Sequence, residues 1–159
     1  MFQRILVPTD GSPAVDAAVD AAGKLAERHD AELHTLHVVQ TERVGGMPLE
    51  TTWVGITDVI RTDAEAVVEA VRERIDSPDI PVTAEIVEGS PAREIVHYAE
   101  TAGCDLVVMG TAGRNGLGRL LLGSVTEQVV RRSPVPVLTI RHQWETETGQ
   151  EPADAPVGG

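Results

Sequence analysis

The 159-residue sequence has little cysteine, lysine or aromatic content, and it lacks a long apolar run. Cys104 is the only cysteine, which excludes an internal disulfide, and its place just before the apolar run 106–109 predicts a buried thiol rather than a nucleophile. No run approaches the ~20 apolar residues that cross a membrane, and no signal-peptide pattern opens the chain. We therefore expect no membrane partner and a cytoplasmic protein.

Basic residues are also scarce, with 13 Lys and Arg against 25 Asp and Glu and a net charge of −12. A field of this sign repels phosphate backbones, and no basic patch interrupts the sequence, so we expect no nucleic-acid partner. Lys24 is the only lysine. An acidic, lysine-poor, halophile-like surface is typical of a cytosol rich in salt, where screening reduces self-repulsion. An ordinary acidic protein is the alternative.

Short apolar runs alternate with segments of helical periodicity, which predicts βαβ units around a parallel sheet. Strands are expected at residues 5–7, 32–39, 82–87, 105–109 and 135–140, and helices at about 13–29, 58–76, 91–102 and 124–132. Right-handed crossovers allow the strand order 3-2-1-4-5. The predicted fold class is α/β: one doubly wound, Rossmann-like domain with a five-stranded parallel sheet and helices on both faces.

Turn and capping residues set the expected boundaries. Ser12-Pro13 and Ser90-Pro91 each place a possible N-cap serine before a proline at the first helical position. Residues 40–57 contain three glycines and a proline without a clear period, which predicts a long loop. The domain is expected to span 1–143, followed by a disordered acidic tail at 144–159.

The two most unusual loops follow the first and fourth strands. Ligands of doubly wound sheets bind beyond the carboxyl ends of the strands where the strand order reverses, which is between these two strands. The loop 110–118 is rich in glycine and leads toward a helix expected at Ser124. Glycine lets backbone N–H groups approach an anion closely, and a helix N-terminus attracts negative charge. This arrangement favours phosphate binding.

Four residues carry this phosphate hypothesis. Gly123 and Ser124 are expected to bring N–H groups and a hydroxyl to the anion, while Gly110 and Gly113 shape the opposite wall. In the alternative interpretation the glycines only turn the chain, and Ser124 caps its own helix in a capping box with Glu127.

Asp10 follows the first strand and is the candidate acid of the site. A carboxylate beside a phosphate can bind a ribose hydroxyl or help to bind Mg²⁺ through water; its alternative role is to form the turn and complement the helix N-terminus. His34 and His37 lie three apart on a strand, so they point to opposite faces and do not form a metal pair. No Ser-His-Asp set or carboxylate pair is evident, so we expect no catalytic residue.

The spacing Gly110-x-x-Gly113, nine residues, Gly123-Ser124 matches the G-2x-G-9x-G-S/T nucleotide motif of the universal stress protein family. The opening segment 5–12 and the closing segments 120–125 and 133–138 also resemble that family, so the resemblance covers about residues 1–141. Family members with this motif bind ATP in a doubly wound five-stranded sheet. The resemblance thus implies a protein that binds ATP, or ADP or AMP, together with Mg²⁺.

The resemblance also implies roles for individual residues. Carried over position by position, the adenosine end is lined by Pro8, Thr9 and Asp10, with Val38 or Val39 beside adenine and Met109 and Gly110 near the ribose, and the phosphates are held by Gly113, Gly123, Ser124 and Val125. Asp10 is also the candidate Mg²⁺ residue, through water. Ala112 stands where family members often carry Arg or His, so one side-chain contact is expected to be missing.

The family resemblance further implies a homodimer formed by edge-to-edge pairing of the last strand, residues 135–140. The sequence supports this because that strand would otherwise be an exposed apolar edge. We therefore expect a cytoplasmic stress-response protein that regulates an unidentified protein partner according to its nucleotide state. The alternatives are a slow ATPase or self-phosphorylating enzyme, and a nucleotide-free protein-interaction module.

Overall fold

Five parallel strands form a single sheet in the computed structural model, which describes residues 1–40, 53–75, 77–111 and 122–141. The order across the sheet is β3-β2-β1-β4-β5. The strands are β1 (Arg4–Thr9), β2 (Glu32–Val39), β3 (Val82–Glu88), β4 (Leu106–Gly110) and β5 (Val137–Ile140). The predicted α/β class and strand order are confirmed.

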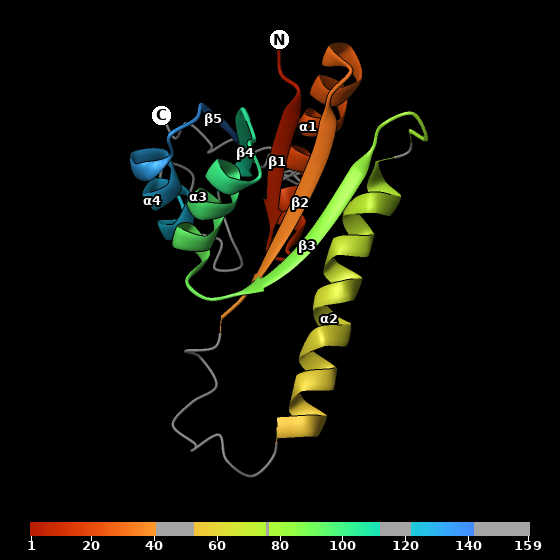
Figure 1. Ribbon diagram of the computed structural model, residues 1–159, viewed down its shortest axis with the longest axis vertical. Coiled ribbons are helices and arrows are strands. Elements are labelled where there is room, and N and C mark those ends of the chain that lie inside the picture. The colour runs from red at the N-terminus through yellow and green to blue at the C-terminus, as the bar shows by residue number, and fades with distance from the viewer. Residues whose placement is uncertain (41–52, 76, 112–121, 142–159) are drawn as a thin grey trace, which may run out of the picture.

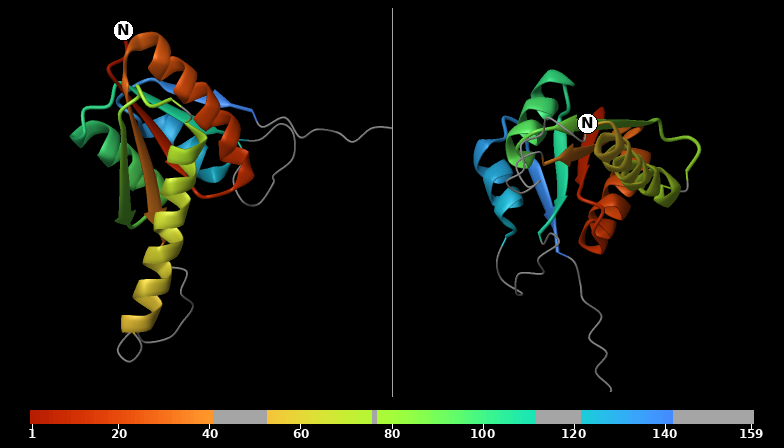
Figure 2. Two further views of the ribbon diagram at one scale, coloured as in Figure 1. Left: turned by 90° about the vertical axis from the view of Figure 1, so that its right-hand side faces the viewer. Right: turned by 90° about the horizontal axis from the view of Figure 1, so that it is seen from below.

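Helices cover both faces of this sheet (Figure 1). The elements on one face are the 3₁₀ turn η1 (Pro13–Val15), α1 (Asp16–His29) and α2 (Trp53–Arg74), and those on the other face are α3 (Pro91–Thr101) and α4 (Ser124–Arg132). Figure 2 shows the sheet between the two helical layers, with the amino-terminal part of α2 extending well past the strands. In the described part of the chain, no helix has the length and apolar character that a membrane crossing requires.

The core is divided by the sheet into two clusters, because successive side chains of a strand point to opposite faces. Ile5 and Val7 of β1 face α1, whereas Leu6 between them faces α3 and α4. The first cluster also contains Leu33, Val108, Ala18, Ala22 and Val71, and the second contains Leu36, Val107, Ile95, Ala99 and Val129. Cys104 belongs to the second cluster and is 4% exposed, which confirms the predicted buried thiol.

Several boundaries differ from the prediction. Helix α2 begins at Trp53 rather than at 58, because one glycine inside a long helix costs only ~1 kcal/mol. Strand β1 continues through Pro8 to Thr9. The proline is tolerated because the register pairs of β1 with β4 end at Leu6, so its missing N–H has the same effect as at a sheet edge. Strand β5 begins at Val137. Residues 41–52 of the predicted loop and the predicted tail at 144–159 lie outside the described residues.

Candidate functional site

The order of the strands reverses between β1 and β4, the place where ligands bind in sheets of this type. The pairing of these two strands is short, with Ile5 opposite Leu106 and Leu6 opposite Val107. Beyond these pairs, residues 7–9 of β1 and 108–110 of β4 run toward the carboxyl edge without register partners in each other. The backbones are therefore least tightly joined at the position predicted for the ligand.

A tight turn connects the end of β1 to η1. Thr9 is buried, and its Oγ1 accepts a hydrogen bond of 3.2 Å from the Gly11 N–H, while Asp10 Oδ1 accepts one of 2.9 Å from the Ser12 N–H. Gly11 has a φ of +76°, a conformation that suits glycine. Asp10 thus forms the turn, the role that the sequence offered as an alternative, and the same bond fixes the direction of its carboxylate.

The start of α4 is attached directly to the carboxyl end of β4. The buried Thr126 hydroxyl donates to the carbonyl oxygen of Gly110 at 2.9 Å. The Gly123 N–H donates to Thr111 O at 2.7 Å, and the Thr111 N–H donates to Ile140 O at 3.0 Å. These three bonds place the helix N-terminus at the carboxyl edge of β4 and β5.

Among the residues that the structure describes, no side chain caps the N-terminus of α4. Gly123 occupies the N-cap position and Ser124 is the first helical residue, so the predicted capping box between Ser124 and Glu127 is wrong. The reason is that Gly123 already has the extended backbone of a cap, with ψ 152°, which leaves the serine inside the helix. A helix leaves the N–H groups of its first turn without intrahelical partners, and here those groups belong to Ser124 and its neighbours. The arrangement can accept an anion.

Residues 1–141 match the universal stress protein family. The chain belongs to this family. The universal stress protein MJ0531 of Methanocaldococcus jannaschii is 36% identical over 141 residues, which cover 89% of this chain and 83% of that protein. The solved structure of MJ0577, from the same organism, superposes with a TM-score of 0.80 at 30% identity, covering 90% of this chain and 98% of the other. A universal stress protein solved in complex with cAMP gives a TM-score of 0.67 at 26% identity, with 88% and 97% covered.

The universal stress protein fold brings most of the predicted site residues to one edge of the sheet. They lie at the end of β1 (Pro8, Thr9 and Asp10), of β2 (Val38 and Val39) and of β4 (Met109 and Gly110), and at the start of α4 (Gly123, Ser124 and Val125). Gly113 lies outside the described residues. Because the strands are parallel, their carboxyl ends share this edge.

Three residues that hold this edge together were missed by the sequence analysis. Thr111 and Thr126 connect β4 to α4, and His37 Nδ1 lies 2.9 Å from the carbonyl oxygen of Thr9. Nothing in the spacing of Thr126 marks a buried hydroxyl inside a helix. His37 could have been found as a polar residue placed beside the end of β1 by the register of two parallel strands.

A second polar cluster lies at the opposite, amino-terminal end of the strands. Arg4 Nε and His34 Nε2 lie 3.3 and 3.1 Å from the Glu32 carboxylate, and His34 Nδ1 lies 2.8 Å from Tyr98 Oη. A hydrogen bond from the Thr83 hydroxyl is the main cause that lowers the pKa of Glu32, and burial raises the pKa of Tyr98 to about 12. These bonds join the strands to α3. Among the described residues, no three His, Cys, Asp or Glu side chains are grouped to hold a metal ion.

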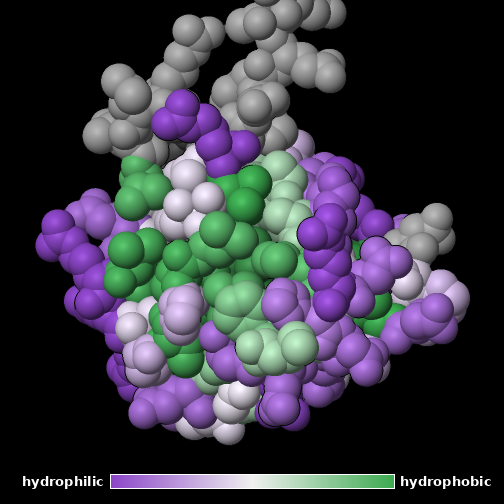
Figure 3. Space-filling view, turned by 90° about the horizontal axis from the view of Figure 1, so that it is seen from above, coloured by the Kyte–Doolittle hydropathy of each residue, from purple (hydrophilic) through white to green (hydrophobic). Residues whose placement is uncertain are grey.

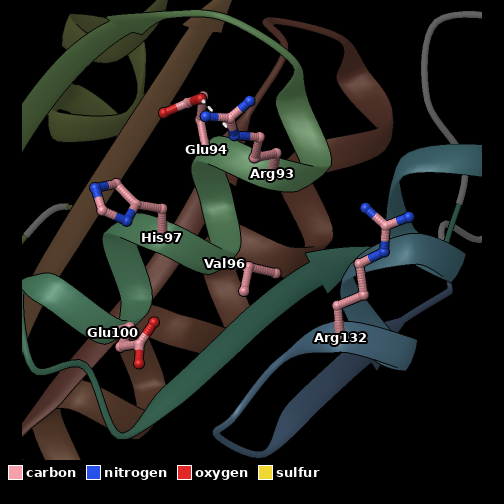
Figure 4. A pocket seen from close by; sticks show the side chains of 6 residues that line it. All are labelled: Arg93, Glu94, Val96, His97, Glu100 and Arg132. Atoms are coloured by element: carbon pink, nitrogen blue, oxygen red, sulfur yellow. Dashed lines mark ion pairs between the residues drawn. The ribbon is translucent and has the colours of Figure 1, made fainter.

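A surface pocket of about 370 Å³ lies between α3 and α4. Its charged side chains carry both signs, with Arg93 3.9 Å from Glu94. Figure 4 shows Arg132 on the far side from these two, and the side chains do not point to a common centre. The pocket offers no set of groups for one class of ligand, so the carboxyl edge remains the candidate site.

Proposed function

We propose that this universal stress protein binds an adenine nucleotide, ATP with Mg²⁺, at the carboxyl ends of β1 and β4, and acts in the cytoplasm as a nucleotide-dependent regulator. The observation that carries the proposal is the N-terminus of α4, which no described side chain caps and which Thr126 fixes to the end of β4. The family supports it, since one universal stress protein has been solved with cAMP.

The phosphate groups would bind at the start of α4. The N–H groups of Ser124 and Val125 lie in the first helical turn, and the exposed Ser124 supplies a hydroxyl beside them. The helix dipole adds a partial positive charge at this end. The N–H of Gly123 is already bonded to Thr111, so this glycine contributes its small size and its backbone shape. Gly113 is included through the spacing of its motif.

The nucleoside would lie along the ends of β1, β2 and β4. Asp10 is oriented by its bond to Ser12, and its carboxylate would accept a hydrogen bond from a ribose hydroxyl. Pro8, Thr9, Val38, Val39, Met109 and Gly110 supply the remaining surface. Val38 or Val39, which are both half-buried, would lie against the apolar face of adenine.

Mg²⁺ fits the chemistry of this edge. It is usually bound by one or two carboxylates together with substrate phosphates and keeps several waters, and Asp10 is the carboxylate that the turn supplies. The protein carries a net charge of −12, which repels a free triphosphate. Charge neutralisation by Mg²⁺ would offset that repulsion.

Substitution of Ser124 by Asp tests the proposal. An acidic residue in the first turn is favourable for a helix, so Ser124→Asp should fold at least as stably as the wild type while repelling a phosphate. Ser90→Asp is the control, because Ser90 stands at the N-terminus of another helix, as the N-cap of α3, and its side chain makes no cap hydrogen bond. The measurements are calorimetric titration with MgATP and a thermal melt in high and moderate salt.

We expect the wild type and Ser90→Asp to bind and Ser124→Asp to lose binding. At 100 times the dissociation constant, nucleotide should stabilise the wild type by about 2.7 kcal/mol. Equal binding of MgATP by the wild type and Ser124→Asp would show that the phosphates do not bind at the start of α4. Failure of the wild type to bind any adenine nucleotide would overturn the proposal and favour a protein-interaction module.

We also propose a homodimer through the β5 edge. Strand β5 is the terminal strand of the sheet and runs along the upper side of the molecule (Figure 2), and hydrophobic side chains gather on the face seen from above (Figure 3). Leu138 of β5 and Val130 of α4 are 37% and 44% exposed. An unpaired apolar edge is a site of association between chains.

Sedimentation of a charged variant tests the dimer. Leu138→Asp should sediment as a monomer at concentrations where the wild type is a dimer. Val59→Asp is the control, because Val59 is 61% exposed on α2, away from β5. A wild-type monomer at working concentration and native-like salt would contradict this proposal.

A further inference from the structure

The imidazole of His37 is attached to the end of β1. His37 lies opposite Thr9 in the last register pair between β2 and β1, and its Nδ1 is 2.9 Å from the carbonyl oxygen of Thr9. A carbonyl oxygen can only accept a hydrogen bond, so Nδ1 carries the proton and donates it. In the neutral ring this fixes the tautomer, with Nε2 unprotonated.

This bond differs from the others at the turn because it comes from another strand. The bonds from Gly11 N–H to Thr9 Oγ1 and from Ser12 N–H to Asp10 Oδ1 span two residues each, so they set the shape of the turn. They do not connect the turn to another strand. The bond from His37 does so: it adds to the pairing of β1 with β2 by holding the Thr9 carbonyl, and hence the plane of the peptide that joins Thr9 to Asp10.

A second contact braces the same turn from α2. A Cβ on Gly11 would lie 2.8 Å from Val67 Cγ2, so α2 packs closely against the turn on the side of Gly11. Beyond Leu6, strand β1 has no register pairs with β4, so the end of the strand depends on β2 and α2 for its position. His37 adds a side-chain hydrogen bond to the backbone pairing between β1 and β2.

We propose that His37 is a positioning residue of the ligand site, which orients Asp10 toward the nucleoside through the Thr9–Asp10 peptide. The inference rests on the proposed nucleotide function and deepens it. His37 acts through its Nδ1–H and does not itself touch the ligand. Because His37 acts on the nucleoside end of the site, its substitution should lower the affinity for adenosine, AMP and ATP by the same factor.

Three substitutions of His37 separate this role from simple packing. His37→Asn keeps an N–H donor on the same Cγ atom, His37→Gln moves the amide one carbon further away, and His37→Leu removes the donor. We expect His37→Leu and His37→Gln to weaken MgATP and adenosine binding about fivefold, the loss of about one hydrogen bond. His37→Asn should bind within about twofold of the wild type. His97→Leu, at an exposed position on α3, is the control.

Coupling to Asp10 supplies a readout that packing alone would not give. In an Asp10→Ala background, His37→Leu should cause no further loss of affinity, because the side chain that it orients has been removed. The ¹⁵N spectrum of the ligand-free protein should show His37 with Nδ1 protonated. That spectrum does not depend on nucleotide binding.

The outcomes separate the two proposals. If the wild type binds and His37→Leu binds equally well, the positioning role is overturned and the nucleotide function stands. If the wild type binds no adenine nucleotide, the function falls and the positioning role with it. If His37→Leu does not fold, the comparison of His37→Asn with His37→Gln decides, and equal affinities of these two variants overturn the inference. A ring protonated on Nε2 instead of Nδ1 overturns it in any case.

Discussion

Replacing Gly11 by alanine should destabilise the protein through two separable effects. The φ of +76° costs an alanine ~1–2 kcal/mol relative to a residue in its preferred region. In addition, the new Cβ would lie 2.8 Å from Val67 Cγ2 and 3.5 Å from Val67 Cγ1, so the helix or the turn must shift. Val67 is β-branched and stiff, and overpacking of this kind costs about 1–3 kcal/mol. We expect Gly11→Ala to lower the free energy of unfolding by about 2–5 kcal/mol.

The chain contains a matched control for the backbone effect. Gly103 has a φ of +65°, but a Cβ there would meet only Arg4 Nη1, at 3.4 Å. Gly103→Ala should therefore lose only the ~1–2 kcal/mol of backbone strain. In the double variant Gly11→Ala with Val67→Ala, the steric part should disappear, so that the two substitutions together cost less than the sum of their separate costs.

Urea denaturation of the four variants and the wild type measures these differences. Linear extrapolation gives the free energy of unfolding for each protein. If Gly11→Ala costs no more than Gly103→Ala, within about 0.5 kcal/mol, the contact between α2 and the turn is not as close as the structure has it. The same conclusion would follow if the losses in free energy of unfolding from Gly11→Ala and Val67→Ala simply added in the double variant.

Further predictions concern substitutions of Gly23 and Thr126 and the alkylation of Cys104. Gly23 lies inside α1, and a Cβ there would be 3.9 Å from its nearest neighbour, Ile75 Cγ1. Gly23→Ala should therefore raise the free energy of unfolding by about 0.5–1 kcal/mol, measured in a thermal scan. Thr126→Val removes the hydroxyl that bonds to Gly110 and should cost about 1–2 kcal/mol in urea, whereas Thr126→Ser should keep the bond. Burial raises the pKa of Cys104 from 9.0 to about 11, so at pH 8 its alkylation should be about a hundredfold slower than in urea. Because the pKa of Cys104 is higher in the folded protein than in the unfolded chain, the folded state is favoured by the neutral thiol below pH 9. This contribution to stability should be lost as the pH rises to 11.

The sheet could be predicted from the sequence because its hydrophobic pattern is strong. Strand β2 and helix α4 have the predicted bounds, since turn residues or prolines flank both segments. The start of α2 was missed because Gly55 and the preceding glycines resemble a loop, and local propensity is a weak guide in a helix held by packing. Pro8 similarly suggested an end for β1 two residues early.

The location of the candidate site could be predicted from topology, but its internal supports could not. The carboxyl edge follows from the strand order and from two unusual loops. The bond from His37 to Thr9 and the bond from Thr126 to Gly110 depend on register and side-chain rotamers, which a single sequence does not specify. The N-cap was assigned to Ser124 instead of Gly123 because residue type alone favours serine at that position.

The short pairing of β1 with β4 has a consequence for how the ligand edge of this protein can change. Beyond Leu6 the two strands are held side by side by packed apolar side chains, among them Val7 and Val108, rather than by a hydrogen-bonded ladder. The spacing of the strands at the ligand edge is then set by side-chain volume. Exchanges among Ala, Val and Ile at such positions can widen or narrow that edge while the strand order and the outer helices stay as they are. Natural variation thus has a route to new ligand preferences that leaves the architecture intact.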